Sequence, residues 1–209
     1  YEFHFEHLKF KNGGVLYTMG QLVRIYVNDL DSRGGKIISF PEGTVAPLVS
    51  EGFSGGTVSL QIQHARGDLG LLMIGGKGGQ GMKGAMGAVG VSSNGLELRF
   101  SKEKGGNLYC AKGGPGGMGG PGARGGRSGN AEIVIVDDNN FDLVTDRQGG
   151  AGGSGGDGGD GGRAGGIGNY CLDVDKEPRG DVGPRGPQGE TGPIQDICIT
   201  KGSGNRQCI

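Results

Sequence analysis

The sequence predicts a mainly β fold: an N-terminal β region followed by a bundle of glycine-rich polyproline II helices interleaved with short strands. Segments of residues 1–74, such as 1–6 and 57–64, alternate apolar and polar side chains, the pattern of half-buried strands. Glycine makes up 52 of the 209 residues and recurs at every third position in four tracts. A period of three matches the polyproline II helix and neither an α-helix nor a strand.

Residues 1–74 are expected to form a β-rich domain that serves for trimerisation or attachment. Tyr1, Phe3 and Phe5 alternate with polar residues at the start. Further strands are predicted over residues 15–19, 21–30, 36–40, 57–64 and 69–74, with turns at 12–14, 31–35 and 41–43. No helix is convincing in this region.

Residues 75–209 are expected to form a glycine-rich polyproline II domain. Its tracts span residues 75–90, 112–129, 147–168 and 178–193. The second and third tracts carry glycine at two of every three positions over much of their length, so two sides of each helix are open to close neighbours. We therefore expect them at the centre of the bundle. The fourth tract has one glycine row and is expected at the periphery.

Strand-like segments separate the tracts. Residues 131–136 alternate β-branched side chains, and Asp137, Asp138, Asn139 and Asn140 follow as turn residues before 141–144. The pattern predicts a β-hairpin there, and a turn is favoured over a calcium site. Shorter strands are predicted over 95–100, 107–111, 169–174 and 195–200.

Charge and hydropathy exclude several partners. The 21 basic and 22 acidic residues are well mixed, which gives no electrostatic basis for binding nucleic acid. No apolar run approaches the roughly 20 residues that a membrane helix needs, so no membrane insertion is expected. Because the chain begins at Tyr1, we expect a processed product or a fragment of a longer fibre protein.

Four cysteines in a loop-rich chain with few apolar residues favour disulfides and an oxidising compartment. Three pairings are open. Cys110 and Cys171 share a local setting, with an Asn and a Tyr just before each, and Cys198 and Cys208 would close a short C-terminal loop. We predict Cys110–Cys171 and Cys198–Cys208, with free cytosolic thiols as the alternative.

No enzymatic function, cofactor or metal site is expected. Matches to a nucleophile elbow around Ser154 and to dinucleotide-binding glycine motifs follow from the glycine content and lack their structural context. His4 and His7 are interpreted as surface residues of a strand, and His64 is alone. Two RGD triplets, at 66–68 and 179–181, make integrin-type adhesion a minority hypothesis.

The four periodic tracts between short strands resemble two families of fibre-tip proteins. They are similar to the glycine-rich adhesins at the tips of T-even-type phage long tail fibres, and to modular trimeric fibre tips of predatory bacteria. In those proteins polyproline II helices form a rigid sandwich whose loops recognise a surface receptor. The resemblance covers residues 75 to about 195, implies a homotrimer, and carries no specific binding motif. Related lattices occur in glycine-rich antifreeze proteins and in a region of certain receptor tyrosine kinases.

The sequence thus predicts an extracellular or cell-surface adhesin that binds a glycan or a surface protein through loops at the tract ends. Tyr109, Phe141 and Tyr170 are secondary candidates for which core packing is favoured. The alternatives are a collagen-like spacer without a small ligand and an ice-binding protein, which the charged residues of the tracts disfavour. The primary candidates are Ser92, Ser93, Asn94, Lys102, Glu103, Lys104, Arg124, Arg127, Asp137, Asp138, Asn139 and Asn140.

Overall fold

The computed structural model describes residues 1–89, 113–163 and 179–209 and shows a mainly β protein, as predicted. These residues form two compact units. The arch unit comprises Tyr1–Gly79, Ala123–Gly153 and Gly189–Ile209, and the glycine unit falls within Gln80–Gly122 and Ser154–Gln188. The strands are β1 (Glu2–Phe10), β2 (Val15–Tyr17), β3 (Leu22–Ile38), β4 (Thr57–Ile74), β5 (Asn130–Gln148), β6 (Ile197–Lys201) and β7 (Gln207–Cys208).

The arch unit holds one seven-stranded sheet in the order β1-β3-β4-β5-β6-β7, with β2 also paired to β3. Every pairing is parallel except β6 with β7. The sheet takes strands from both sides of residue 74, the expected domain boundary.

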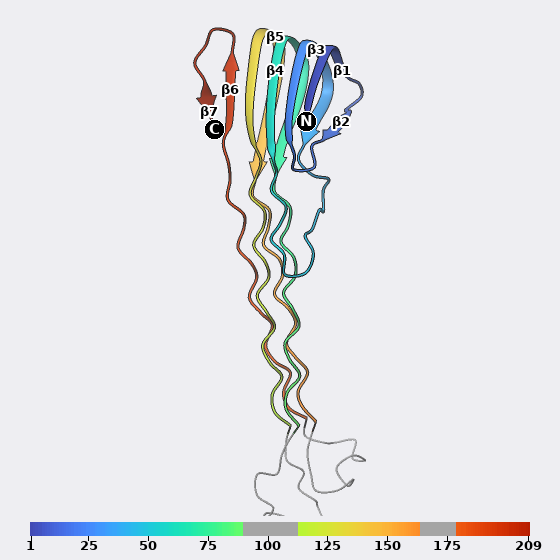
Figure 1. Ribbon diagram of the computed structural model, residues 1–209, viewed down its shortest axis with the longest axis vertical. Coiled ribbons are helices and arrows are strands. Elements are labelled where there is room, and N and C mark those ends of the chain that lie inside the picture. The colour runs from blue at the N-terminus through green and yellow to red at the C-terminus, as the bar shows by residue number, and fades with distance from the viewer. Residues whose placement is uncertain (90–112, 164–178) are drawn as a thin grey trace, which may run out of the picture. The chain divides into compact units, whose positions relative to one another are not determined.

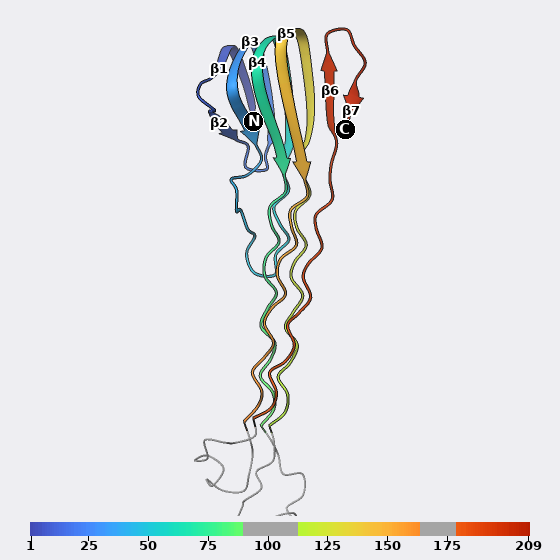
Figure 2. The ribbon, with the colours of Figure 1, turned by 180° about the vertical axis from the view of Figure 1, so that it is seen from behind.

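The three long strands are arches. Each of β3, β4 and β5 runs along one side, bends, and returns along the other (Figures 1 and 2). Each arm pairs with the same arm of the next strand: Val58 lies opposite Ala131 on the first side of β4 and β5, and Leu71 opposite Thr145 on the second. β1 and β2 make an equivalent arch beside β3, with a turn between them.

The prediction of a β-hairpin around residues 137–140 is wrong. The chain does reverse there, but the first arm of β5 pairs with β4 and β6 and the second arm pairs with β4, so the two arms are not strand partners of each other. Alternation shows that each arm buries one face but does not show which strand pairs with it. Each bend contains a left-handed residue, supplied by Gly34 (φ 67°), Gly67 (φ 88°) and Asn140 (φ 54°), which are residue types that tolerate this conformation.

The hydrophobic core lies between the two sides of the arches. Side chains from successive strands stack in register, as Ile25, Leu60 and Ile133 do, and each of these is at most 1% exposed. Burying an aliphatic side chain of this size contributes about 1.5–3 kcal/mol. The stack is therefore held by its apolar interior.

The glycine-rich segments are joined by backbone hydrogen bonds that recur every third residue. In the glycine unit, the amide of Gly186 donates to Gly156, that of Gly156 to Gly120, and that of Gly120 to Met82, each at 2.8 Å. In the arch unit, Gly192 donates to Gly150, Gly150 to Gly126, and Gly126 to Gly76. A Cβ on Gly156 would meet the carbonyl oxygen of Met82, so only glycine allows this approach.

The pairing pattern confirms which segments are central. In the glycine unit, residues 113–122 and 154–163 each hydrogen bond to the other three described segments. Residues 80–89 and 179–188 each bond to those two. The second and third tracts are therefore central and the fourth peripheral, as their glycine density predicts.

Candidate functional site

A row of acidic and basic side chains crosses the arches just before their bends. In β1, β3 and β4, two such positions flank an inward residue, as His7 and Lys9 flank Leu8 in β1, and β5 contributes one position. The strand register places His7, Asp29, His64 and Asp137 opposite one another, and Lys9, Asp31 and Arg66 opposite one another. We call these seven residues the charged ladder. Because the intervening Leu30 and Ala65 are 2% and 1% exposed, the charged groups lie on the outer face.

The first row of the ladder consists of two histidine–aspartate pairs. The Nδ1 of His7 lies 2.9 Å from Oδ2 of Asp29, and the Nδ1 of His64 lies 3.2 Å from Oδ2 of Asp137. All four side chains are at least half exposed. The pairs follow the register, so the strands bring together residues 22 and 73 positions apart in the sequence.

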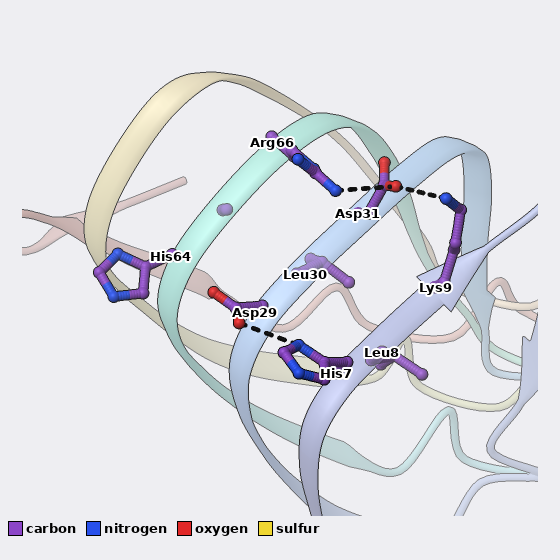
Figure 3. A pocket seen from close by; sticks show the side chains of 9 residues that line it. His7, Leu8, Lys9, Asp29, Leu30, Asp31, His64 and Arg66 are labelled. Atoms are coloured by element: carbon purple, nitrogen blue, oxygen red, sulfur yellow. Dashed lines mark hydrogen bonds and ion pairs between the residues drawn. The ribbon is translucent and has the colours of Figure 1, made fainter.

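The second row is centred on Asp31, whose side chain is 15% exposed. One carboxylate oxygen, Oδ2, accepts hydrogen bonds from Lys9 Nζ at 2.8 Å and from the Arg66 guanidinium at 3.2 Å (Figure 3). The hydrogen bond from Lys9 is the main cause that lowers the pKa of Asp31, and the positive charge of Arg66 lowers the pKa further. Asp31 is therefore an ionised carboxylate that Lys9 and Arg66 hold in place.

The ladder surrounds a hollow of about 520 Å³ lined by residues 7–9, 29–31 and 64–66. Figure 3 shows Arg66 and Lys9 reaching Asp31 from the strands on either side of it. The Arg66 side chain is 71% exposed. A guanidinium carries five N–H donors, so Arg66 can hold Asp31 and an anionic group of a ligand together.

The predicted residues 137–140 lie at the β5 end of this row. Asp138 accepts hydrogen bonds from Lys201 Nζ at 2.6 Å and from the backbone amide of Phe141 at 2.8 Å. The bond from Lys201, followed by that from Phe141, lowers the pKa of Asp138. Asn140 supplies the bend of β5. This predicted loop therefore adjoins the charged ladder and continues it toward β6.

Arg124 and Arg127 belong instead to the glycine-rich segment before β5. The Nε of Arg124 lies 3.9 Å from Oε2 of Glu190, and the carbonyl oxygen of Arg127 accepts the amide of Gly55. Phe141 is 4% exposed and packs in the core, the role that the sequence favoured over ligand binding. The other predicted binding residues lie outside the described residues: Ser92, Ser93, Asn94, Lys102, Glu103, Lys104, Tyr109 and Tyr170.

The predicted disulfide between Cys198 and Cys208 is confirmed; it joins β6 to β7 at positions that are register partners. Cys110 and Cys171 lie outside the described residues. In the first RGD triplet, Arg66 contacts Asp31 and the Asp68 carboxylate accepts the amide of Gly34 at 2.8 Å. That triplet is thus part of the bend of β4.

The sequence interpretation missed the ladder. It took His7 as a surface residue of a strand, which it is, and His64 as alone, but it did not identify the aspartates of neighbouring strands that both face. A signal was present. A charged, apolar, charged triplet precedes each of the first three bends, and the triplets are basic at 7–9, acidic at 29–31 and basic at 64–66.

A second hollow, of about 710 Å³, lies beside the returning arms of β3 and β4, and Tyr17, Lys36, Phe40, Lys77 and Gln148 are among its lining residues. Among the residues that the structure describes, no three His, Cys, Asp or Glu side chains are grouped to hold a metal ion. Within the same ranges, no helix is long and apolar enough to span a membrane.

Comparisons with known proteins gave no match, either to a family model, to a curated protein or to a solved structure. Function is therefore inferred from the residues themselves.

Proposed function

We propose that this chain is an extracellular adhesin, a fibre-tip domain that recognises a cell-surface glycan or an outer-membrane component. The charged ladder is the observation that carries the proposal. Its ionic side chains stand in register on stacked arches, and Lys9 and Arg66 are held by the carboxylate of Asp31. Groups fixed before binding lose little conformational freedom when a ligand arrives.

The glycine-rich segments supply the rigid support in this proposal, as polyproline II helices. A helix with three residues per turn presents the same side once per turn, which accounts for hydrogen bonds at every third residue, as at Gly156, Gly159 and Gly162. Their backbone groups are used by neighbouring segments, and their glycines offer no side chains to a ligand. The disulfide of β6 and β7 supports an oxidising, extracellular location.

The ligand class that fits the ladder is an acidic glycan. Lys9 and Arg66 lie on the strands either side of Asp31 and both contact its Oδ2, at 2.8 and 3.2 Å, so the two nitrogens are at most 6.0 Å apart. Together they can bind one carboxylate or sulfate group of a polysaccharide. The carboxylates of Asp29 and Asp137 in the neighbouring row can accept hydrogen bonds from sugar hydroxyls.

Binding to an array of acidic and neutral glycans tests the proposal. We expect acidic glycans to bind, and Lys9→Gln and Arg66→Gln each to weaken binding about 10- to 150-fold, since a charge-assisted hydrogen bond contributes roughly 1.5–3 kcal/mol. Lys36→Gln removes an equal charge from the second hollow and serves as the matched control. Circular dichroism checks that each variant is folded.

Three outcomes would change the conclusion. If no glycan of the array binds and a purified surface protein clearly does, the glycan is rejected as the ligand. Loss of binding in Lys36→Gln, with the ladder variants unaffected, would move the site to the second hollow. No binding to glycans, outer-membrane extracts or surface proteins would reject the adhesin and favour a structural spacer.

A further inference from the structure

The outermost arch, formed by β1 and β2, leaves its apolar side chains uncovered. Phe3 and Phe5 are 43% and 37% exposed, and Leu16 is 37% exposed. Their register partners in β3, Ile25, Val27 and Ile37, are at most 3% exposed. Among the residues that the structure describes, the apolar columns of the core thus continue to the end of the stack without a covering layer.

The surface of this arch is also hollowed. Phe3, Phe5, Leu8 and Phe10 contribute to a hollow of about 280 Å³. An adjacent hollow of about 290 Å³ is lined by Tyr1, Phe3, Leu16, Tyr17, Thr18, Met19, Gln21 and Val23. A contiguous exposed apolar surface of this kind marks an interaction site.

β1 is an edge strand within the described part of the sheet, because it pairs with β3 alone. Such a strand presents a row of backbone donors and acceptors that another strand can use. Its sequence contains no proline and no glycine that would discourage pairing. The occupant that fits should therefore add a strand and cover the apolar columns together.

The inward positions of β1 are arranged symmetrically about its middle. Phe3 and Phe5 pair with Ile25 and Val27, and Leu8 pairs with Leu30, so the inward side shifts by one residue after Phe5. The inward residues are then 3, 5, 8 and 10, centred between residues 6 and 7. An antiparallel copy aligned on this centre places Phe3 opposite Phe10 and Phe5 opposite Leu8.

In the same alignment, an acidic residue comes opposite a basic one at two of the three outward pairs. The first half is acidic and the second half, continued by Lys11, is basic. Glu2 of one copy comes opposite Lys11 of the other, and Glu6 comes opposite His7. The remaining outward pair is His4 with Lys9, and Lys9 is already held by Asp31 at 2.8 Å. Opposite charges placed directly across an antiparallel pair are stabilising, and like charges are destabilising.

We propose that the occupant of this face is a second copy of the chain, with β1 of each copy paired antiparallel about a two-fold axis. Two-fold dimers are the commonest closed oligomers, and their interfaces must be self-complementary. The apolar positions of β1, and the opposition of Glu2 to Lys11, meet that requirement. The dimer would join two arch stacks into one sheet and cover both apolar ends.

Charge-reversal substitutions in β1 and at Lys11, made in the whole chain, test this pairing. Sedimentation equilibrium over a range of concentrations should give a dimer of twice 21.2 kDa. Glu2→Lys and Lys11→Glu each place like charges opposite each other at two symmetry-related positions, so each should raise the dimer dissociation constant by about tenfold. The double variant restores opposite charges and should return the constant to within about threefold of the parent value.

The two residues are exposed, so the variants should fold, and circular dichroism with thermal unfolding checks this. A monomer at all concentrations would overturn the proposal and indicate that another segment or partner covers the face. A trimer would also overturn it. A dimer in which the double variant is weaker than both single variants would reject the antiparallel alignment of β1.

Discussion

Gly119 and Gly120 are adjacent residues of one glycine-rich segment, yet the structure predicts very different costs for alanine at the two positions. A Cβ on Gly119 would meet the carbonyl oxygen of Gly156 in the neighbouring segment. A Cβ on Gly120 would come no closer than 3.3 Å, to the backbone nitrogen of Met82. Gly119→Ala is therefore the perturbation, and Gly120→Ala is its matched control.

The magnitude follows from the hydrogen bonds around each site. Separating Gly119 from Gly156 disturbs the bond from Gly119 to Pro184, 3.0 Å long, and the bond from Gly156 to Gly120, 2.8 Å long. At about 1 kcal/mol each, with about 1–3 kcal/mol for overpacking and a gain of about 0.4–1 kcal/mol from the stiffer unfolded chain, Gly119→Ala should cost about 2–4.5 kcal/mol. Gly120→Ala needs only a small shift of Met82, and the same entropic gain offsets the free-energy cost of that shift.

Amide hydrogen exchange measured by NMR is the appropriate assay, because it reports the free energy of local opening. Gly119→Ala should accelerate exchange at Gly156 and Gly159 by roughly 30- to 2000-fold, the change in opening equilibrium that corresponds to about 2–4.5 kcal/mol. Gly120→Ala should change it less than about threefold. Equal effects of the two substitutions would refute the claim that backbone contact at specific glycines holds these segments together.

Three further predictions concern the arch unit. Ile62 is 1% exposed, so Ile62→Ala should lower the free energy of unfolding by about 2–5 kcal/mol, whereas exposed Val144→Ala should change it by less than about 0.5 kcal/mol in chemical denaturation. Cys198→Ser opens a loop with a sequence separation of 10 and should cost the β6–β7 hairpin up to about 2.7 kcal/mol, seen as faster proteolysis there with an unchanged core. Because the pKa values of Asp31 and Asp138 are lowered from the ordinary 3.8, both carboxylates stabilise the fold above that pH. This contribution should disappear as the pH falls below 3.8, and thermal unfolding at a series of pH values would show no such loss if the ion pairs were unimportant.

Much of the fold could be predicted from periodicity. Alternation identified the arms of β3, β4 and β5, and the glycine count of the second and third tracts predicted their central place. The arches could not be predicted, since their arms pair with strands distant in sequence, as Leu60 does with Ile133. Turn residues such as Asn140 indicate a reversal equally well in an arch and in a hairpin.

The candidate site was predictable only in part. Asp137 and Asp138 were identified as a polar cluster after a strand. Their partners His64 and Lys201 lie 73 and 63 residues away, so only the parallel register brings them together. The alternation of basic and acidic triplets indicates opposite charges on neighbouring strands only once that register is known.

An NMR titration with an acidic glycan that binds on the array tests the central claim most directly. The proposed function predicts that the largest changes in amide and side-chain resonances occur at His7, Lys9 and Arg66, with the affinity reduced in Arg66→Gln and kept in Lys36→Gln. Changes confined to the second hollow around Tyr17 and Lys36, or the same affinity in Arg66→Gln as in the parent chain, would contradict the assignment of the charged ladder as the binding surface.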